Sequence, residues 1–251
     1  MHLILSGATG LVGSAVLHQM LINPGINQIS ILSRRPVPFA EALPAEHKEK
    51  VKVYIHRDFA TYPASLLTEL KGAKGCVWSL GVSQNDVDAK TYEEVTLGYP
   101  VAAAKAFSEL FDEFNFVYVS GEGATLKPGF TTPIFGRVKG QAESALLQLS
   151  KETKYSSLKP YSLRPAAVDP TRHPEIQPYL PKNLPLYRRV LSPLIYPLTR
   201  TLWTSFHSPT AELGKVLVEL AMGDGRPLQG VGVSGEGRTI SNVGMRRLAG
   251  I

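Results

Sequence analysis

The residues that first suggest chemistry are three glycines in the run Gly7-Ala8-Thr9-Gly10-Leu11-Val12-Gly13, which follows the apolar residues 3–5. Gly7 permits a sharp turn, Gly10 has no Cβ to obstruct a phosphate, and Gly13 allows a helix to pack closely on a strand. Free N–H groups at the start of the following helix attract an anion, as does the positive end of its dipole. A strand-like segment before the run and a helix-like segment after it favour a loop that binds the pyrophosphate of a dinucleotide.

The residues after the second apolar run, 28–33, indicate which dinucleotide this is. An NAD site usually has a carboxylate at this position, which accepts a hydrogen bond from the ribose 2′-hydroxyl, whereas a 2′-phosphate is held by arginine. This chain has Ser33-Arg34-Arg35-Pro36 and no acidic residue before Glu41. Guanidinium groups bind phosphate through paired hydrogen bonds, so the pattern favours NADP over NAD and over a merely solvated basic turn.

The elements that must position these residues follow from an alternation of apolar runs with helical patterns. Strands are expected at 3–5, 28–33, 51–55, 75–80, 115–120 and 161–164, with helices after Gly13 and over 63–70, 91–111 and 134–150. This alternation is typical of a parallel sheet covered on both faces. It predicts an α/β fold with a doubly wound, mostly parallel Rossmann-type sheet, in which ligands bind at the carboxyl ends of the strands.

The composition changes after residue 168, where prolines recur and interrupt the apolar stretch 184–203. We therefore expect an NAD(P)-binding core over 1–168 and a small proline-rich substrate cap over 169–208. Residues 209–251 are expected to complete the single domain with a helix ending near Met222 and a strand around 231–233. The apolar residues 191–198 leave three readings open: core packing under a loop, a hydrophobic substrate pocket, or a peripheral contact with a membrane surface.

The chain as a whole resembles an ordinary soluble enzyme, with 251 residues, 43% hydrophobic residues and a net charge of +6. The single cysteine, Cys76, excludes an intrachain disulfide and is expected to be a buried core thiol. No signal-peptide pattern and no run of about 18–20 apolar residues occurs, so a cytoplasmic location without a transmembrane segment is expected. The basic residues are scattered without interleaved aromatic residues, so a nucleic-acid partner is not expected.

The spacing of residues along the chain indicates neither a metal site nor a hydrolase site. The six histidines, at 2, 18, 47, 56, 173 and 207, show neither i,i+4 pairs nor CxxC partners. No metal site is therefore predicted. A Gly-x-Ser-x-Gly elbow is also absent from the sequence, which argues against a hydrolase.

Taken together, these features resemble an atypical short-chain dehydrogenase/reductase, and most closely the Tat-interacting-protein group of small oxidoreductases. The resemblance extends from Leu3 to about Met222. It rests on the glycine run 7–13, Ser33-Arg34-Arg35, Ser79-Leu80-Gly81, Tyr118-Val119-Ser120, Val138-Lys139-Gly140 and Leu163-Arg164-Pro165. The glycine run and the last motif are specific when they occur together at this spacing.

The resemblance implies an NAD(P) cofactor, which the arginine pair narrows to NADP, and a set of residues that bind it. Asp58 and Phe59 would flank the adenine, Ser79, Leu80 and Gly81 would line the cofactor after the fourth strand, and Lys139 would hold the ribose. Pro165, Ala166 and Val168 would meet the nicotinamide carboxamide. The remaining members of the expected set are Gly7, Thr9, Gly10, Leu11, Val12, Ser33, Arg34 and Arg35.

The chemistry that the resemblance implies is hydride transfer assisted by a serine, a tyrosine and a lysine. The lysine is present as Lys139, but Phe135 stands four residues earlier, where the tyrosine is expected. Phenylalanine has no proton to transfer. After the fifth strand Ser120 matches the first of two family serines, and Gly121 stands at the second. Lys139 and Ser120 are therefore the expected catalytic residues.

Three functions are compatible with this pattern. The first and favoured one is an NADPH-dependent reductase of a small hydrophobic carbonyl compound. Its proton would come from Lys139, Glu122, Tyr118, Tyr187, His173 or His207. The second is a non-catalytic NADP(H)-binding sensor or interaction protein. The third is a non-redox isomerase or cyclase that uses the same pocket. The substrate and the oligomeric state are left open by the sequence.

Overall fold

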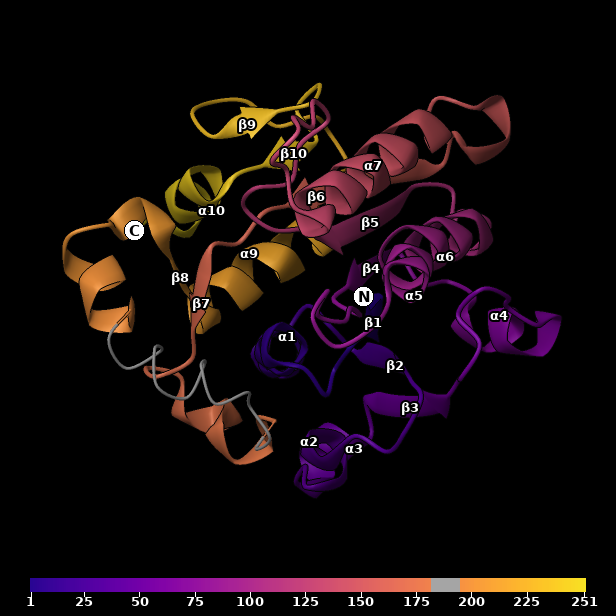
Figure 1. The fold of residues 1–251 in the computed structure, drawn as a ribbon. Coiled ribbons are helices and arrows are strands. Elements are labelled where there is room, and N and C mark those ends of the chain that lie inside the picture. Colours follow the sequence, from indigo (N-terminus) through magenta and orange to yellow (C-terminus); the bar gives the residue numbers. More distant parts are fainter. Residues whose placement is uncertain (182–194) are drawn as a thin grey trace.

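A computed structural model describes residues 1–181 and 195–251 of the chain. Its central feature is an eight-stranded sheet in the order β3-β2-β1-β4-β5-β6-β10-β9, with helices on both sides (Figure 1). All neighbouring strands in it are parallel except β9 and β10, which are antiparallel. The strands are β1 (His2–Ser6), β2 (Gln28–Ser33), β3 (Val51–Ile55), β4 (Gly75–Trp78), β5 (Phe114–Val119), β6 (Leu158–Leu163), β9 (Val233–Ser234) and β10 (Thr239–Ile240). The predicted doubly wound, mostly parallel Rossmann-type fold is confirmed.

Two apolar layers form the core because successive side chains of a strand point to opposite faces of the sheet. Leu3 and Leu5 of β1 belong to one cluster, and Ile4 between them belongs to the other. The first cluster is covered by α1 (Leu11–Ile22), α9 (Thr210–Met222) and α10 (Asn242–Ala249). The second is covered by α4 (Ala64–Leu70), α6 (Tyr99–Phe107) and α7 (Ile134–Leu149). Cys76 lies fully buried in the second cluster, as predicted.

The strand order reverses at β1, which has β2 on one side and β4 on the other. In open α/β sheets such a switch point leaves a crevice outside the carboxyl ends of the strands, where ligands bind. The loop with the three glycines emerges from β1 at this point. The fold therefore places the expected cofactor loop where the topology provides room for it.

The prediction of one continuous helix over 91–111 is wrong, because the segment is broken into three pieces. The chain forms α5 (Ala89–Glu93), a π-helical turn over Glu94–Gly98 and then α6, which ends at Phe107. Pro100 lies in the first turn of α6 and has no N–H group to continue the regular ladder of hydrogen bonds from the preceding turn. The π turn accommodates this break.

The strand predicted at 161–164 begins earlier, at Leu158, and contains Pro160. Pro160 pairs with Phe116 of β5, whereas β10 reaches only Ser162 and Leu163. The proline therefore lies where β6 has a partner on one side only, a position that tolerates a missing donor.

The carboxyl-terminal part contains α9 as predicted, and the strand expected around 231–233 forms as β9. It is not the last element, because β10 and α10 follow it. Ser241 caps α10 by accepting a hydrogen bond from the N–H of Gly244, and Gly250 ends it with a positive φ of 78°. β10 extends the sheet next to β6, so this part of the chain belongs to the same core.

The region between β6 and α9 holds a second, two-stranded parallel sheet of β7 (Ala167–Asp169) and β8 (His207–Pro209). Two 3₁₀ turns, Pro174–Tyr179 and Thr204–Phe206, and a helical segment over 195–201 accompany it. Tyr187, expected as a possible proton donor, and the apolar residues 191–194 lie outside the described residues. The boundaries proposed for the cap stay a prediction.

The remaining short elements connect the sheet to its surroundings. They are α2 (Pro38–Glu41), α3 (Ala45–Lys48) and a 3₁₀ turn at Thr153–Tyr155. Within the described ranges, no helix combines the length and the apolar character that crossing a bilayer requires.

Candidate active site

The segments expected to bind the cofactor all follow the carboxyl ends of neighbouring parallel strands (Figure 1). The glycine loop follows β1, the arginine pair follows β2, and Asp58 follows β3. Ser79 follows β4, Ser120 follows β5, and Pro165 follows β6. Parallel strands end at the same edge of a sheet, so six segments that are distant in sequence converge on one crevice.

The glycine loop is packed tightly against the loop after β4. Gly7 has a positive φ of 76°, and a Cβ built on it would lie 2.5 Å from the carbonyl oxygen of Ser79. A Cβ on Gly13 would lie only 2.0 Å from the carbonyl oxygen of Gly7. Ser79 also donates from its N–H and its hydroxyl to the carbonyl oxygen of Ser6. Only glycine fits at positions 7 and 13, as the fingerprint requires.

The start of α1 leaves its N–H donors uncapped, as an anion site requires. Gly10 is the N-cap residue, no side chain caps the helix, and its first turn has no acidic residue. The nearest atom to a Cβ built on Gly10 is the carbonyl oxygen of Gly7, 3.3 Å away. The residues of this cradle therefore fit a pyrophosphate, because N–H groups and the positive end of the helix dipole face the same space.

Arg34 and Arg35 lie exposed after β2, next to this loop. Ser33 fixes the turn by donating from Oγ to the carbonyl oxygen of Arg35 at 2.7 Å. Among residues 1–181 and 195–251, neither guanidinium group forms an ion pair. Both are thus available to an anionic ligand at this edge.

Asp58 and Phe59 follow β3 and lie in different environments, one exposed and one buried. Asp58 accepts hydrogen bonds from the hydroxyl of Thr61 and the N–H of Ala60, and these bonds hold its pKa below the usual value. Phe59 is fully buried and packs against Trp78, so its ring belongs to the core. A surface cavity of about 560 Å³ lies beside this turn and is lined by residues 55–58 and 61–63.

Lys139 and Ser120 come together below the end of β5. The Nζ atom of Lys139, on α7, donates to the carbonyl oxygens of Val119 at 3.0 Å and Ser120 at 2.8 Å. Burial lowers the pKa of the Lys139 amine to about 8, although Glu143 acts in the opposite direction. The hydroxyl of Ser120 is buried and has no hydrogen-bond partner within the described residues. Buried hydroxyls usually have a hydrogen-bond partner, so Ser120 keeps an unused donor at the end of β5.

The two departures from the family pattern, Phe135 and Gly121, lie in contact. A Cβ built on Gly121 would be 2.8 Å from Cζ of the Phe135 ring. Gln84, from the loop after β4, accepts a hydrogen bond from the N–H of Phe135 at 2.8 Å and helps to fix the start of α7. The ring of Phe135 therefore occupies space that a second serine side chain would need.

Two of the other expected proton donors are engaged elsewhere. Tyr118 is buried, its hydroxyl donates to the carbonyl oxygen of Thr96, and burial raises its pKa well above the usual value. It is a core residue. Glu122 accepts from the N–H of Asn242 at 2.6 Å and so joins the loop after β5 to the start of α10.

His173 and His207 line a different cavity, of about 220 Å³, at the base of the cap region. His207 Nε2 lies 2.9 Å from Oδ2 of Asp169, which also accepts from Nε of Arg200 at 2.7 Å. None of the residues lining this cavity belongs to the expected cofactor set. The structure does not bring these two histidines together with Lys139 and Ser120.

The loop after β6 is held by residues that local sequence patterns do not reveal. Ala166 donates from its N–H to the hydroxyl of Ser208 at 2.9 Å, and Ser208 donates to Oδ1 of Asn242 at 2.6 Å. Asn242 is fully buried. Pro165 accepts from the N–H of Glu122 at 2.9 Å. These contacts fix the segment in which Pro165, Ala166 and Val168 are expected to meet the nicotinamide.

Comparisons with known proteins give relatives over nearly the whole chain. The sequence is 40% identical to Leucinostatins biosynthesis cluster protein T of Purpureocillium lilacinum, over 98% of this chain and 94% of the relative. It is 44% identical to Botcinic acid biosynthesis cluster B protein 16 of Botryotinia fuckeliana, over 59% of this chain and 97% of the relative. No protein-family model matches the sequence.

Solved structures share the fold at low sequence identity. An oxidoreductase of the short-chain dehydrogenase/reductase family from Burkholderia thailandensis superposes with a TM-score of 0.69 at 14% identity, over 99% of this chain and 92% of that one. A dTDP-glucose 4,6-dehydratase variant from Streptomyces venezuelae, solved with NAD bound, gives 0.62 at 15% identity, over 100% and 79%. The chain therefore belongs to the family of Leucinostatins biosynthesis cluster protein T and has the Rossmann fold of the short-chain dehydrogenase/reductases.

Proposed function

We propose that this chain binds NADP(H) and is an oxidoreductase that acts on a small hydrophobic carbonyl compound. One observation carries the proposal. The glycine loop opens an uncapped helix at the switch point of the sheet, and two exposed arginines stand at the end of the next strand. Amide N–H groups and the helix dipole would hold the pyrophosphate, and Arg34 and Arg35 would hold a 2′-phosphate.

When bound, NADPH would supply a hydride to the carbonyl carbon of the substrate. The residues of the chain would bind and orient the reactants. Lys139 would hold the nicotinamide ribose, and the segment from Pro165 to Val168, braced by Ser208, would position the carboxamide. Ser120 would donate a hydrogen bond from its unpartnered hydroxyl to the carbonyl oxygen of the substrate.

The proton that completes the reduction would come from the ammonium group of Lys139. Its pKa of about 8 keeps the group protonated at neutral pH, yet makes it a stronger acid than an ordinary lysine. The proton would pass to the carbonyl oxygen as the carbonyl carbon gains the hydride, which gives an alcohol. Lysine would regain its proton from water. Phe135 would then contribute packing only.

The names of the relatives suggest the setting of this activity. Two of them belong to biosynthesis clusters of leucinostatins and of botcinic acid. We place the substrate of this chain among the carbonyl intermediates of a comparable biosynthesis, where a ketone or aldehyde must be reduced.

A second candidate, binding of NADP(H) without turnover, is favoured by the contact between Phe135 and Gly121. Neither position has the polar group that the resemblance to short-chain dehydrogenase/reductases leads us to expect, and the phenyl ring lies against Gly121. A protein with an intact cradle and this apolar contact would report the NADPH level to a partner and would not reduce a substrate.

The experiment that separates the two is a screen of hydrophobic ketones and aldehydes with purified protein and saturating NADPH. NADPH consumption and alcohol formation are both measured. For a reductase we expect alcohol formation. We also expect the kcat of Lys139→Met to be at least about 100-fold lower than that of the parent protein, because positioned proton transfer contributes about that factor or more. Lys105→Met changes an exposed lysine of α6 in the same way and should leave kcat unchanged. Saturable NADPH binding without alcohol from any carbonyl would instead support the sensor.

A further inference from the structure

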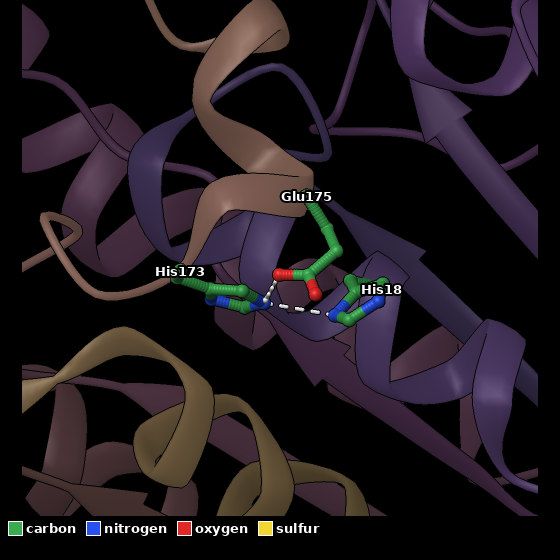
Figure 2. Close-up of side chains that lie close together, drawn as sticks. All are labelled: His18, His173 and Glu175. Carbon is green, nitrogen blue, oxygen red and sulfur yellow. Dashed lines mark hydrogen bonds and ion pairs between the residues drawn. The ribbon is translucent and has the colours of Figure 1, made fainter.

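Three side chains with metal-binding atoms meet outside the proposed cofactor site. His18 lies on α1, and His173 and Glu175 lie at the start of the 3₁₀ turn Pro174–Tyr179 (Figure 2). The Nδ1 atom of His18 is 2.8 Å from Nε2 of His173, and Oε2 of Glu175 is 3.9 Å from the same nitrogen. All three ligand atoms lie within 4.8 Å of one another.

The type and spacing of these atoms suit a zinc ion. Two imidazole nitrogens and a carboxylate oxygen are a frequent ligand set for Zn²⁺, with metal–ligand distances of about 2.0–2.2 Å. In a tetrahedral site such distances place two nitrogens about 3.3 Å apart. The two ring nitrogens must therefore separate by about half an ångström, and Oε2 of Glu175 must approach Nε2 of His173 by a similar amount. Glu175 is about half exposed, and its side chain can make this movement.

A further contact orients His173 as zinc-binding histidines usually are oriented. Its other ring nitrogen, Nδ1, lies 3.0 Å from the hydroxyl of Thr210 at the start of α9. Such an outer hydrogen bond fixes the tautomer and the ring direction of a ligand histidine. The His173 side chain is only 3% exposed, so Nε2 is held toward His18 and Glu175. The half-exposed Glu175 leaves water access to a fourth coordination position.

We propose that His18, His173 and Glu175 bind one Zn²⁺ ion, with water as the fourth ligand. The ion would join the turn after β7 to α1, the helix that begins at the glycine loop, and through Thr210 to α9. This proposal departs from the expectation of no metal site, which rested on spacing along the chain. His18 and His173 are 155 positions apart, so no sequence motif could reveal them. The proposal does not depend on the proposed reductase activity.

The test is calorimetric titration of chelator-treated, full-length protein with zinc chloride. We expect saturable binding of one ion per chain with a micromolar or lower Kd, and a rise in Tm on adding zinc. His18→Gln should weaken binding at least about 100-fold, which is the upper end of the cost of losing an outer-shell partner. Thr210→Val should weaken it by about 10–100-fold. His47→Gln, at a histidine on α3 that is outside the cluster, is the matched control and should bind as the parent does.

Folding does not limit the test, because His18 lies part-exposed on the surface of α1 and its replacement leaves the core intact. Circular dichroism of the zinc-free His18→Gln protein should match that of the parent. The absence of saturable zinc binding by the parent protein would overturn the proposal and leave a directly hydrogen-bonded histidine pair. Equal zinc affinities and equal Tm shifts for His18→Gln and His47→Gln would overturn it as well.

Discussion

At the scale of single residues, the candidate site combines groups suited to binding a dinucleotide with few groups suited to catalysis. Gly7 and Gly13 have no room for a side chain, and Arg34 and Arg35 are free to bind an anion. Phe135, in contrast, offers no proton. This leaves Lys139, whose amine donates to the carbonyl oxygens of Val119 and Ser120, as the acid in the proposed reaction.

The lowered pKa of Lys139 has a measurable consequence for stability. Its pKa is about 8 in the folded chain, against a usual value of 10.5. Between these two values the unfolded state binds more protons, so this residue makes the free energy of unfolding rise as the pH increases. We expect the parent protein to gain stability relative to Lys139→Met from pH 8 to about pH 10.5.

Urea denaturation at a series of pH values measures this difference. Lys105→Met, which removes an exposed lysine, serves as the control and should follow the parent protein over the same range. A constant difference between the parent and Lys139→Met across the window would mean that the amine titrates normally.

At the scale of elements, local sequence patterns predicted the strands well. The strands at 28–33 and 51–55 have the predicted bounds, because runs of alternating or continuous apolar residues end at polar or proline-containing turns. The apolar periodicity did not predict the break between α5 and α6, because this break depends on a single residue, Pro100. It also missed α10, whose eight residues are too few to repeat an apolar stripe over several turns; Ser241 caps its start, and the N–H of Asn242 is bound by Glu122.

A buried ion pair joins α7, which carries Lys139, to the end of β6. Arg164 donates from Nε to Oε1 of Glu143 at 2.8 Å, and the Glu143 side chain is only 3% exposed. Glu143→Gln leaves the guanidinium group without its counter-charge and should lower the free energy of unfolding by about 3–5 kcal/mol.

The matched control is Glu69→Gln, which breaks an exposed pair with Lys52. Exposed pairs contribute about 0–1 kcal/mol, so this change should be small. Chemical denaturation compares the two variants. A loss in Glu143→Gln no larger than that in Glu69→Gln would show that the buried pair does not hold α7 in place.

At the scale of the whole molecule, the site is assembled from six strand ends, and the sequence reveals only those that carry a local motif. The glycine and arginine segments could be placed at strand ends from the sequence, because their patterns are short and lie next to predicted strands. Gln84, Ser208 and Asn242 could not, since each acts through hydrogen bonds to residues far away in the sequence. The histidine cluster was missed for the same reason: its partners meet only after α1 packs against the turn that follows β7.

The most direct test of the central claim, a cofactor site selective for NADP(H), is a fluorescence titration of the purified protein with NADPH and, separately, with NADH. We expect micromolar NADPH binding and NADH binding about 10–100-fold weaker, because hydrogen bonds to charged groups contribute about 1.5–3 kcal/mol. Replacing Arg34 and Arg35 together with alanine should remove this preference. Arg226→Ala, at an exposed arginine paired with Asp224, should retain it. Equal affinities for the two cofactors, or binding of neither, would contradict the account.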